Sequence, residues 1–368
     1  MRFPEFSGEW NKYTINDLAT VVGGGTPDTT VKSYWGGDIQ WFTPSEIGKN
    51  KYVDFSKRTI TRDGLDNSSA KLLPLHTILL SSRATVGECS IASNECTTNQ
   101  GFQSLIAKQC NIDFLYYLIQ TKKKDLIRNA CGSTFLEISA NEIRKIKVAV
   151  PVQNEQEQIA KLLSLIDERI ATQNKIIEDL KKLKSAISLK MLHSDSWEQF
   201  RIKDIAIIGR GRVISSVEIS QQKNPTYPVY SSQTSNEGIM GYLDDYMFEG
   251  EYISWTTDGA NAGTVFYRNG KFNCTNVCGL LKLKKGFDTH FVSLVLAEAT
   301  KKYVSVNLAN PKLMNNTMGN IQIRLPKLEE QKRISIVFRR LHELLAIHNN
   351  LLTEYSKQKQ YLLSQMFI

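Results

Sequence analysis

Several features that would place this chain in a particular class of protein are missing from its 368 residues. The six cysteines include no Cys-x-x-Cys pair and none of the Cys/His spacings of a zinc site, so we interpret them as reduced, mostly buried side chains. No apolar run approaches the roughly 20 residues that cross a bilayer, and the first residues lack the apolar core of a signal peptide. We therefore expect a cytoplasmic protein with no membrane partner.

Complete catalytic motifs are missing as well. The glycines of the stretch 23–28 are not followed by the Lys-Ser/Thr of a P-loop, and the stretch 209–213 lacks the third glycine of a dinucleotide fingerprint. The stretch 224–227, NPTY, has Thr226 where an amino-methyltransferase loop has its second proline. The five histidines form no close cluster, and no Gly-x-Ser-x-Gly elbow is present. The sequence predicts no catalytic residue, no metal site and no cofactor bound by this chain, which favours a binding protein.

Length and charge indicate what such a protein would bind. A chain of this length predicts two globular units rather than one core. The net charge of +9 is spread over both halves, which suits nucleic acid approached from two places. A modest basic surplus is also common on proteins that never contact nucleic acid, so charge alone is a weak guide.

The clearest pattern is a long internal repeat. PVQNEQEQIA (151–160) is answered by PKLEEQKRIS (326–335), and the match continues to Met191 and Met366. In both copies the apolar residues step by alternate fours and threes, which is typical of a coiled coil. Neither copy has an internal proline or glycine, so each predicts one continuous helix that begins near its proline.

The helical repeat predicts an antiparallel pairing with a polar layer. Two seam positions are polar in both copies, Gln173 with His348 and Lys184 with Lys359. Antiparallel pairing would bring Gln173 near His348, and we hypothesise that this layer fixes register; the alternative is that both side chains are simply solvated beside a groove. The predicted seam residues are Ile159, Leu163, Ile166, Ile170, Gln173, Ile177, Leu180, Ile334, Phe338, Leu341, Leu345, His348, Leu352 and Tyr355.

The segments between the helices repeat too. WNKYTINDLA (10–19) is echoed by WEQFRIKDIA (197–206), and weaker matches follow, among them TTNQG (97–101) with CTNVC (274–278). Short apolar stretches separated by turn residues predict strands at 76–82, 146–150, 251–257, 263–267 and 321–325, with helices at 112–127 and 290–304. The expected architecture is a tandem duplication with pseudo-two-fold symmetry: two mixed α/β (α+β) domains, 1–150 and 196–325, with helices at 151–195 and 326–368.

Two diverged domains joined by a rigid helical spacer would recognise two different binding sites that lie a fixed distance apart. DNA offers that geometry, because half-sites one helical turn apart, about 34–36 Å, lie on one face of the duplex. A helix of 40 residues is about 60 Å long, enough to separate two such readers. Two nearly identical helices also offer two similar docking surfaces to one type of partner.

The order of these parts, the Pro-x-x-x-Glu-Gln helix starts, GGGTPD…YWGGDIQWFTPSEI (23–47) and GSTFLEISANEIRKIKVAVP (132–151) resemble the DNA specificity subunits of type I restriction-modification enzymes. The resemblance implies a non-catalytic subunit with two target-recognition domains, each reading half of a bipartite site in double-stranded DNA. It implies two methyltransferase partners that methylate adenine at N6 with S-adenosylmethionine, and ATP- and Mg²⁺-dependent restriction (translocase) subunits. The second domain departs from the family, because it lacks the Gly-Gly-Thr-Pro stretch.

Polar loop residues are the predicted DNA contacts, since Arg and Lys neutralise phosphates while Arg, Asn, Gln, Ser and Thr pair with base edges. We predict Thr26, Lys32, Ser82 and Arg83 in the first domain and Arg210, Arg212, Gln233, Thr256 and Asn261 in the second. A solitary two-domain DNA-binding regulator and an interaction scaffold without nucleic acid are the alternatives, and salt-sensitive DNA affinity separates them.

Overall fold

The computed structural model describes residues 2–132, 136–305 and 310–367. Its contacts divide the chain into two compact units, the first made of residues 1–176 and 348–368 and the second of residues 177–347. This division cuts both long helices, α6 (Gln153–Met191) and α11 (Leu328–Met366), so each unit contains part of each helix. The sequence predicted consecutive segments, 1–150, 151–195, 196–325 and 326–368. The two units are instead defined by contacts within the structure, so each unit combines parts of several segments.

The first unit combines three small sheets with short helices. The sheet orders are β1-β10, β2-β9-β6-β7-β4 and β5-β3-β8. The strands are β1 (Asn11–Thr14), β2 (Ala19–Gly23), β3 (Trp35–Phe42), β4 (Tyr52–Val53), β5 (Arg58–Ile60), β6 (Ile78–Leu80), β7 (Cys89–Ala92), β8 (Cys96–Thr98), β9 (Gln103–Ala107) and β10 (Lys147–Val150). The helices besides α6 are α1 (Ile15–Leu18), η1 (Lys32–Tyr34), η2 (Pro44–Glu46), α2 (Arg62–Asp66), α3 (Ile112–Thr121), α4 (Lys123–Arg128) and α5 (Ala140–Lys145).

The second unit repeats this plan, with its strands distributed differently among three sheets. Its sheet orders are β11-β20, β12-β19-β16-β17 and β14-β13-β18-β15. The strands are β11 (Glu198–Arg201), β12 (Ala206–Arg210), β13 (Tyr227–Tyr230), β14 (Ile239–Leu243), β15 (Phe248–Glu249), β16 (Tyr252–Thr256), β17 (Val265–Arg268), β18 (Lys271–Cys274), β19 (Cys278–Leu283) and β20 (Gln322–Leu325). The helices besides α11 are α7 (Ile202–Ile205), α8 (Ser216–Ser220), η3 (Ser235–Gly238), α9 (Thr289–Ala299), η4 (Thr300–Lys302) and α10 (Asn315–Asn320).

The main elements of the two units correspond, which confirms the predicted duplication and the mixed α/β class. β1 pairs antiparallel with β10 as β11 does with β20, and β3 pairs in parallel with β8 as β13 does with β18. The five predicted strands are β6, β10, β16, β17 and β20. The two predicted helices are α3 with α4, and α9. Of the stretch 132–151, residues 133–135 lie outside the described part of the chain.

The repeated helix start has a structural role that is the same in both units. Gln156 donates from Nε2 to the Pro151 carbonyl (2.9 Å) and accepts at Oε1 from the Asn111 amide (3.0 Å). Gln331 repeats both bonds, to the Pro326 carbonyl (2.8 Å) and from the Asp288 amide (2.9 Å). Asn111 and Asp288 are the N-cap residues of α3 and α9. Each buried glutamine therefore fastens the start of a long helix to the domain helix beside it.

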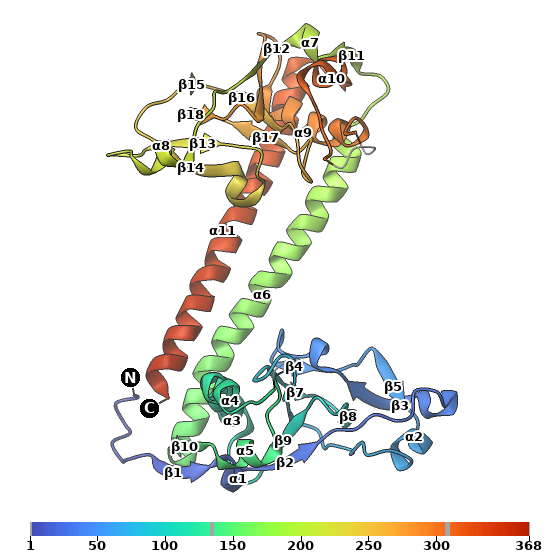
Figure 1. The fold of residues 1–368 in the computed structure, drawn as a ribbon, viewed down its shortest axis with the longest axis vertical. Helices are drawn as coiled ribbons and strands as arrows, with labels where there is room; N and C mark the ends of the chain where they lie inside the picture. The colour runs from blue at the N-terminus through green and yellow to red at the C-terminus, as the bar shows by residue number, and fades with distance from the viewer. Residues whose placement is uncertain (1, 133–135, 306–309, 368) are drawn as a thin grey trace. The chain divides into compact units, whose positions relative to one another are not determined.

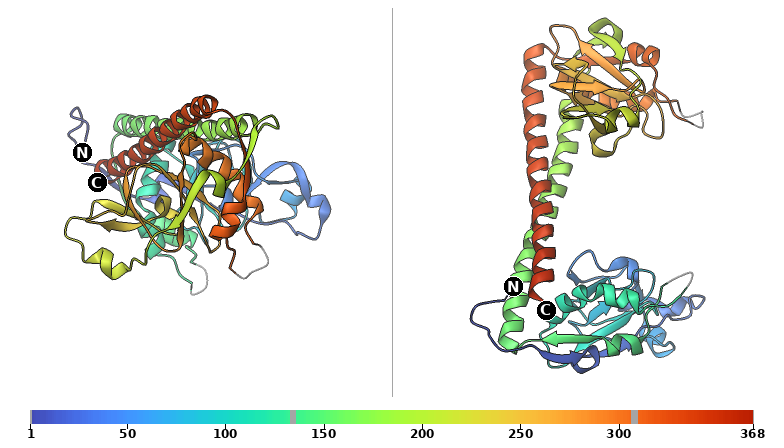
Figure 2. Two further views of the ribbon diagram at one scale, coloured as in Figure 1. Left: turned by 90° about the horizontal axis from the view of Figure 1, so that it is seen from above. Right: turned by 60° about the vertical axis from the view of Figure 1, so that its left-hand side comes forward.

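The long helices run in opposite directions within each unit (Figures 1 and 2). In the first unit Asp167 pairs with Lys359 (2.7 Å) and the Arg169 guanidinium lies over the Tyr355 ring. His348 Nδ1 lies 2.7 Å from Gln173 Oε1, as antiparallel pairing predicts. All of the predicted seam residues are buried or half-buried. The antiparallel coiled coil is confirmed, and the role of the Gln173–His348 pair in fixing register remains a hypothesis.

The seam residues nearest the helix starts belong to the cores of the units. In the first unit Ile159, Leu163 and Ile166 pack in the core that also holds Leu362 and Met366 from the end of α11. In the second unit Ile334 and Phe338 pack with Leu192, which follows the end of α6. Each core is therefore completed by the far end of the other long helix.

Candidate nucleic-acid interface

In the first unit, three loops meet because a glycine allows close backbone contact. Gly24, after β2, faces the loop that follows β8, and a Cβ placed on it would lie 2.0 Å from the Asn99 carbonyl oxygen. The Gly25 amide donates to the Thr98 carbonyl (2.8 Å), and the Thr26 hydroxyl donates to Gln100 Oε1. The loop at 24–26 is therefore held against the loop at 98–101.

The loop after β6 joins the same cluster. The Ser82 amide donates to the Gly101 carbonyl (2.9 Å), and the Ser82 carbonyl accepts from the Ile138 amide (2.9 Å). Arg83 Nε lies 3.7 Å from Glu137 Oε2. Thr26, Ser82 and Arg83, which are distant in sequence, thus come together around residues 98–101. Lys32 lies apart from these bonds, exposed on η1.

The four residues predicted to contact DNA in the first unit differ in their exposure to solvent. Ser82 is fully buried and its side chain faces the interior, so in this conformation it does not present its hydroxyl to DNA. Arg83 and Lys32 are exposed and Thr26 is half-buried. Sequence alone gave no sign that the second serine of the Ser-Ser-Arg stretch points inward. The DNA-binding role of the exposed residues stays a prediction.

The second unit builds the same cluster from different residues. A Cβ on Gly211 would lie 1.5 Å from the Cys274 carbonyl oxygen, and Arg212 forms an isolated parallel bridge with Thr275. Counting from the paired tryptophans Trp10 and Trp197, Gly211 is the equivalent of Gly24. The second domain therefore keeps the one glycine that the geometry needs, although the rest of the Gly-Gly-Thr-Pro stretch is gone.

The two predicted arginines of the second unit already have protein partners. Arg210 donates from Nε to Asn315 Oδ1 (2.9 Å) and is half-buried. Arg212 is exposed and pairs with Glu218, and the hydrogen bonds from this guanidinium lower the pKa of the Glu218 carboxyl. A phosphate would have to compete with Glu218 for Arg212, which makes Arg212 a weaker phosphate contact than an unpaired arginine.

The remaining predicted residues of the second unit divide in the same way as those of the first. Thr256 is buried, and its hydroxyl donates to the Asn261 carbonyl, so it shapes the loop rather than offering a donor to DNA. Asn261 and Gln233 are exposed. Asn261 donates from Nδ2 to Thr234 Oγ1 (3.1 Å), and Gln233 donates from Nε2 to the Ile239 carbonyl (2.5 Å).

Two exposed amides at the centre of the clusters escaped the sequence prediction. Gln100 contacts Thr26, and the Asn276 carbonyl accepts from Arg210 at 3.5 Å. Both lie in the paired stretches TTNQG and CTNVC, whose similarity between the halves was the available signal. Asn and Gln amides pair with adenine edges in the major groove, so these positions suit base reading.

The cysteines are free, and all but Cys131 are buried. Burial raises the pKa of the Cys110 thiol to about 12, so that thiol stays protonated. Among the described residues no group of three or more His, Cys, Asp or Glu side chains is placed to hold a metal ion. None of the described helices has both the length and the apolar character of a membrane span.

Comparison with known proteins places both halves in one family. Residues 7–182 and 194–355 match the family described as type I restriction modification DNA specificity domain. The MjaIX type I restriction enzyme specificity subunit of Methanocaldococcus jannaschii is 39% identical over 183 residues, which are 48% of this chain and 42% of that subunit. A putative type I specificity subunit of Mycoplasma pneumoniae is 36% identical over 221 residues, 57% of this chain and 79% of that protein. The match thus spans less than half of the archaeal relative.

Two solved structures share the fold. A crystal structure of a type I restriction-modification S subunit from M. genitalium superposes with a TM-score of 0.71 at 18% identity, covering 100% of this chain and 99% of that one. A chain from a structure of type I restriction-modification complex assembly and conformational transition gives 0.57 at 13% identity, covering 98% of each chain. At these identities the likeness establishes the fold.

Proposed function

Because this chain belongs to the type I restriction modification DNA specificity domain family, we propose that it is the DNA-reading, non-catalytic subunit of a type I restriction-modification complex. Each unit reads one half of a bipartite target in double-stranded DNA. The observation that carries this proposal is the family match in both halves, together with a loop cluster that is built around an equivalent glycine in each unit.

The differences between the two clusters support a target whose halves differ in sequence. One cluster presents the exposed side chains of Gln100 and Arg83 and the half-buried Thr26, and the other presents exposed side chains that include Gln233, Asn261 and Asn276. Side-chain donors and acceptors of these types distinguish bases in the major groove. Equivalent scaffolds with different exposed residues would therefore read different half-sites.

The catalytic steps would lie in partner subunits. Two methyltransferase subunits would dock on the repeated helices and use S-adenosylmethionine to methylate adenine at N6, one on each strand. Restriction subunits would supply ATP- and Mg²⁺-dependent cleavage. The repeat supports this arrangement because two helices with the same start and the same apolar spacing offer similar docking surfaces to two copies of one partner.

The first experiment is single-molecule sequencing of the source genome for N6-methyladenine, in the parent strain and in a strain lacking this gene. We expect one bipartite motif, methylated on both strands, to disappear with the gene. An unchanged methylome in a parent strain shown to make the protein and its methyltransferase would overturn the proposal and favour a solitary DNA-binding regulator.

A second measurement tests DNA reading directly. The chain, purified with its methyltransferase partner, should bind the identified motif with an affinity that falls as salt rises, because phosphate contacts release counterions. An affinity that does not change with salt, or is equal for scrambled DNA, would instead favour an interaction scaffold.

A further inference from the structure

The first unit carries a short N-terminal arm that has no counterpart in the second unit. The arm consists of residues 2–9, before β1, and it ends beside Trp10. Arg2 donates from Nε to Glu155 Oε1 (2.7 Å) and from a terminal nitrogen to Glu155 Oε2 (2.6 Å). Its other terminal nitrogen donates to the Gly8 carbonyl, which closes the arm on itself. The arm therefore delivers one guanidinium, in bidentate geometry, to a single carboxylate.

Glu155 depends on that guanidinium because it is completely buried. None of its side chain is exposed, and its other side-chain contact is the Trp10 indole nitrogen, 3.3 Å away. A buried carboxylate without a cationic partner is strongly unfavourable. The arm also packs Phe3 against the core of the unit. Arg2 and Phe3 thus cover the start of α6.

The second unit has the same frame and no arm. Glu330 is the repeat equivalent of Glu155, and Trp197 is that of Trp10. The tryptophans hold the same position, because Trp10 packs edge-on against Phe114 and Trp197 packs edge-on against Phe291, with ring centroids 6.1 and 5.8 Å apart. Before Trp197 the chain comes directly from α6 through residues 192–196, so no segment reaches back over Glu330.

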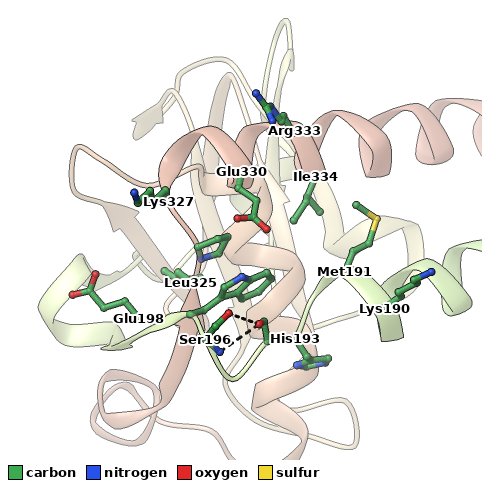
Figure 3. Close-up of a pocket in the computed structure, with 13 residues that line it drawn as sticks. Lys190, Met191, His193, Ser196, Glu198, Leu325, Lys327, Glu330, Arg333 and Ile334 are labelled. Atoms are coloured by element: carbon green, nitrogen blue, oxygen red, sulfur yellow. Dashed lines mark hydrogen bonds between the residues drawn. The ribbon is translucent and has the colours of Figure 1, made fainter.

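A pocket lies where the arm would be. It has a volume of about 840 Å³, and its lining includes the apolar side chains of Trp197 and Met191, the acidic Glu198 and Glu330, and the basic Lys190, His193, Lys327 and Arg333. Glu330 is exposed, and in the described chain no side chain forms an ion pair or hydrogen bond with its carboxylate. Figure 3 shows Glu330 extending into this space while the side chains of Lys327 and Arg333 extend away from it. The pocket thus offers an unpaired carboxylate close to the half-buried side chains of Trp197 and Met191.

We propose that this pocket binds an arginine-bearing, arm-like segment of a different protein, with the guanidinium on Glu330 and an apolar neighbour against the half-buried Trp197 and Met191. We expect these contacts because Arg2 and Phe3 make the corresponding ones in the first unit, with Glu155 and with the core beside it. A second copy of this chain is the less suitable occupant, because its own arm is already bound to its buried Glu155. Arginine suits the site better than lysine, because its planar fork gives two parallel bonds to one carboxylate. The inference concerns a protein partner and does not depend on how DNA is read.

The test uses the full chain and a fluorescent peptide with the sequence of residues 1–9, MRFPEFSGE, as the probe. Fluorescence anisotropy should show saturable binding with one peptide per chain. The Glu330→Gln substitution should weaken binding at least tenfold, as should alanine in place of the peptide arginine. Lysine at that position should restore part of the affinity.

Glu329→Gln is the matched control, since Glu329 is the neighbouring exposed glutamate and pairs with Lys332 on its own helix. It should leave peptide affinity unchanged. Both variants remove one exposed charge, and a thermal melt shows whether they remain folded.

Three results would overturn the proposal. The first is no binding at millimolar peptide. The second is binding that Glu330→Gln does not weaken, which would mean that the peptide exchanges with the chain's own arm at Glu155. The third is self-association of the chain that both Arg2→Ala and Glu330→Gln abolish, because the pocket would then belong to the arm of a second copy.

Discussion

Replacing the polar layer of the coiled coil by leucine tests whether this layer lowers folding stability while it fixes the register of the two helices. Gln173 and His348 are both half-buried, and their side chains are joined by one hydrogen bond of 2.7 Å. The perturbation is the pair of substitutions Gln173→Leu and His348→Leu, made singly and together. Both residues belong to the first unit, so its unfolding transition is the one to follow.

The magnitude follows from burial and from the lost bond. Full burial of a leucine contributes about 1.5–3 kcal/mol, so two half-buried leucines contribute about 2 kcal/mol. The lost hydrogen bond costs about 1 kcal/mol net, which leaves the double variant about 1 kcal/mol more stable. Each single variant leaves one partner without its bond, at a cost of about 1–3 kcal/mol, and gains about 1 kcal/mol from its leucine. Single variants should be neutral or destabilised, and the double variant stabilised.

The assay is calorimetry of wild type, both single variants and the double variant. For a unit of this size, a gain of 1 kcal/mol raises the melting temperature by about 2–4 °C. Gln158→Leu is the control, because Gln158 is an exposed glutamine on the same helix and its substitution should change stability by less than about 0.5 kcal/mol. If the single effects add to the double effect within about 0.5 kcal/mol, the two side chains are uncoupled and the layer has no role in register.

Four further predictions follow from named contacts. Gln156→Ala or Gln331→Ala removes two buried bonds to backbone groups, so urea denaturation should show a loss of about 2–4 kcal/mol in the unit concerned. Gly211→Ala should lower the melting temperature sharply because its Cβ overlaps the Cys274 carbonyl, whereas Gly209→Ala, with no atom within 4 Å, should not; equal effects would contradict this account of the loop cluster. Burial lowers the pKa of His290 to about 4, so the unfolded chain binds more protons between about pH 4 and 6.5. The second unit should therefore lose on the order of 2 kcal/mol as pH falls through that window, and His290→Asn should remove most of this dependence in melts at pH 5 and 7. Arg83→Ala should change sequence preference if Arg83 reads a base, or weaken all sequences alike if it contacts phosphate; Lys145→Ala, whose ion pair with Glu142 lies within α5, is the control, and no effect on DNA binding would remove Arg83 from the interface.

The repeat allowed much of the fold to be predicted from sequence. The 3.5-residue spacing predicted both long helices, each with one apolar face for a partner helix. Their opposite directions were predicted separately, from the pairing that brings Gln173 next to His348. The Gln156 and Gln331 bonds explain why the helix starts repeat. They could not be predicted from sequence because the donors to the glutamine oxygens are backbone amides 45 and 43 residues earlier in the chain.

The candidate site was less predictable, because whether a loop side chain faces inward depends on tertiary packing. Ser82 and Arg83 are adjacent, yet one is buried and the other exposed. Thr256, the last residue of β16 in the second unit, is also buried. A polar residue in such a stretch can be buried or exposed. The sequence therefore located these stretches but could not distinguish the side chains that hold them in place from those that face solvent.

The way each unit closes has a consequence for how the chain folds as it is synthesised. Residues 177–347 form the second unit as one continuous stretch, whereas the first unit needs residues 348–368 in addition to 1–176. Leu362 and Met366, which follow the whole second unit in the chain, pack in the core with Phe114 and Ile159. At about 5–20 residues per second, the ribosome needs roughly 10–40 s after residue 176 to reach them. The second unit is therefore synthesised in full before the first, whose apolar core stays incomplete until the end of α11 has been made.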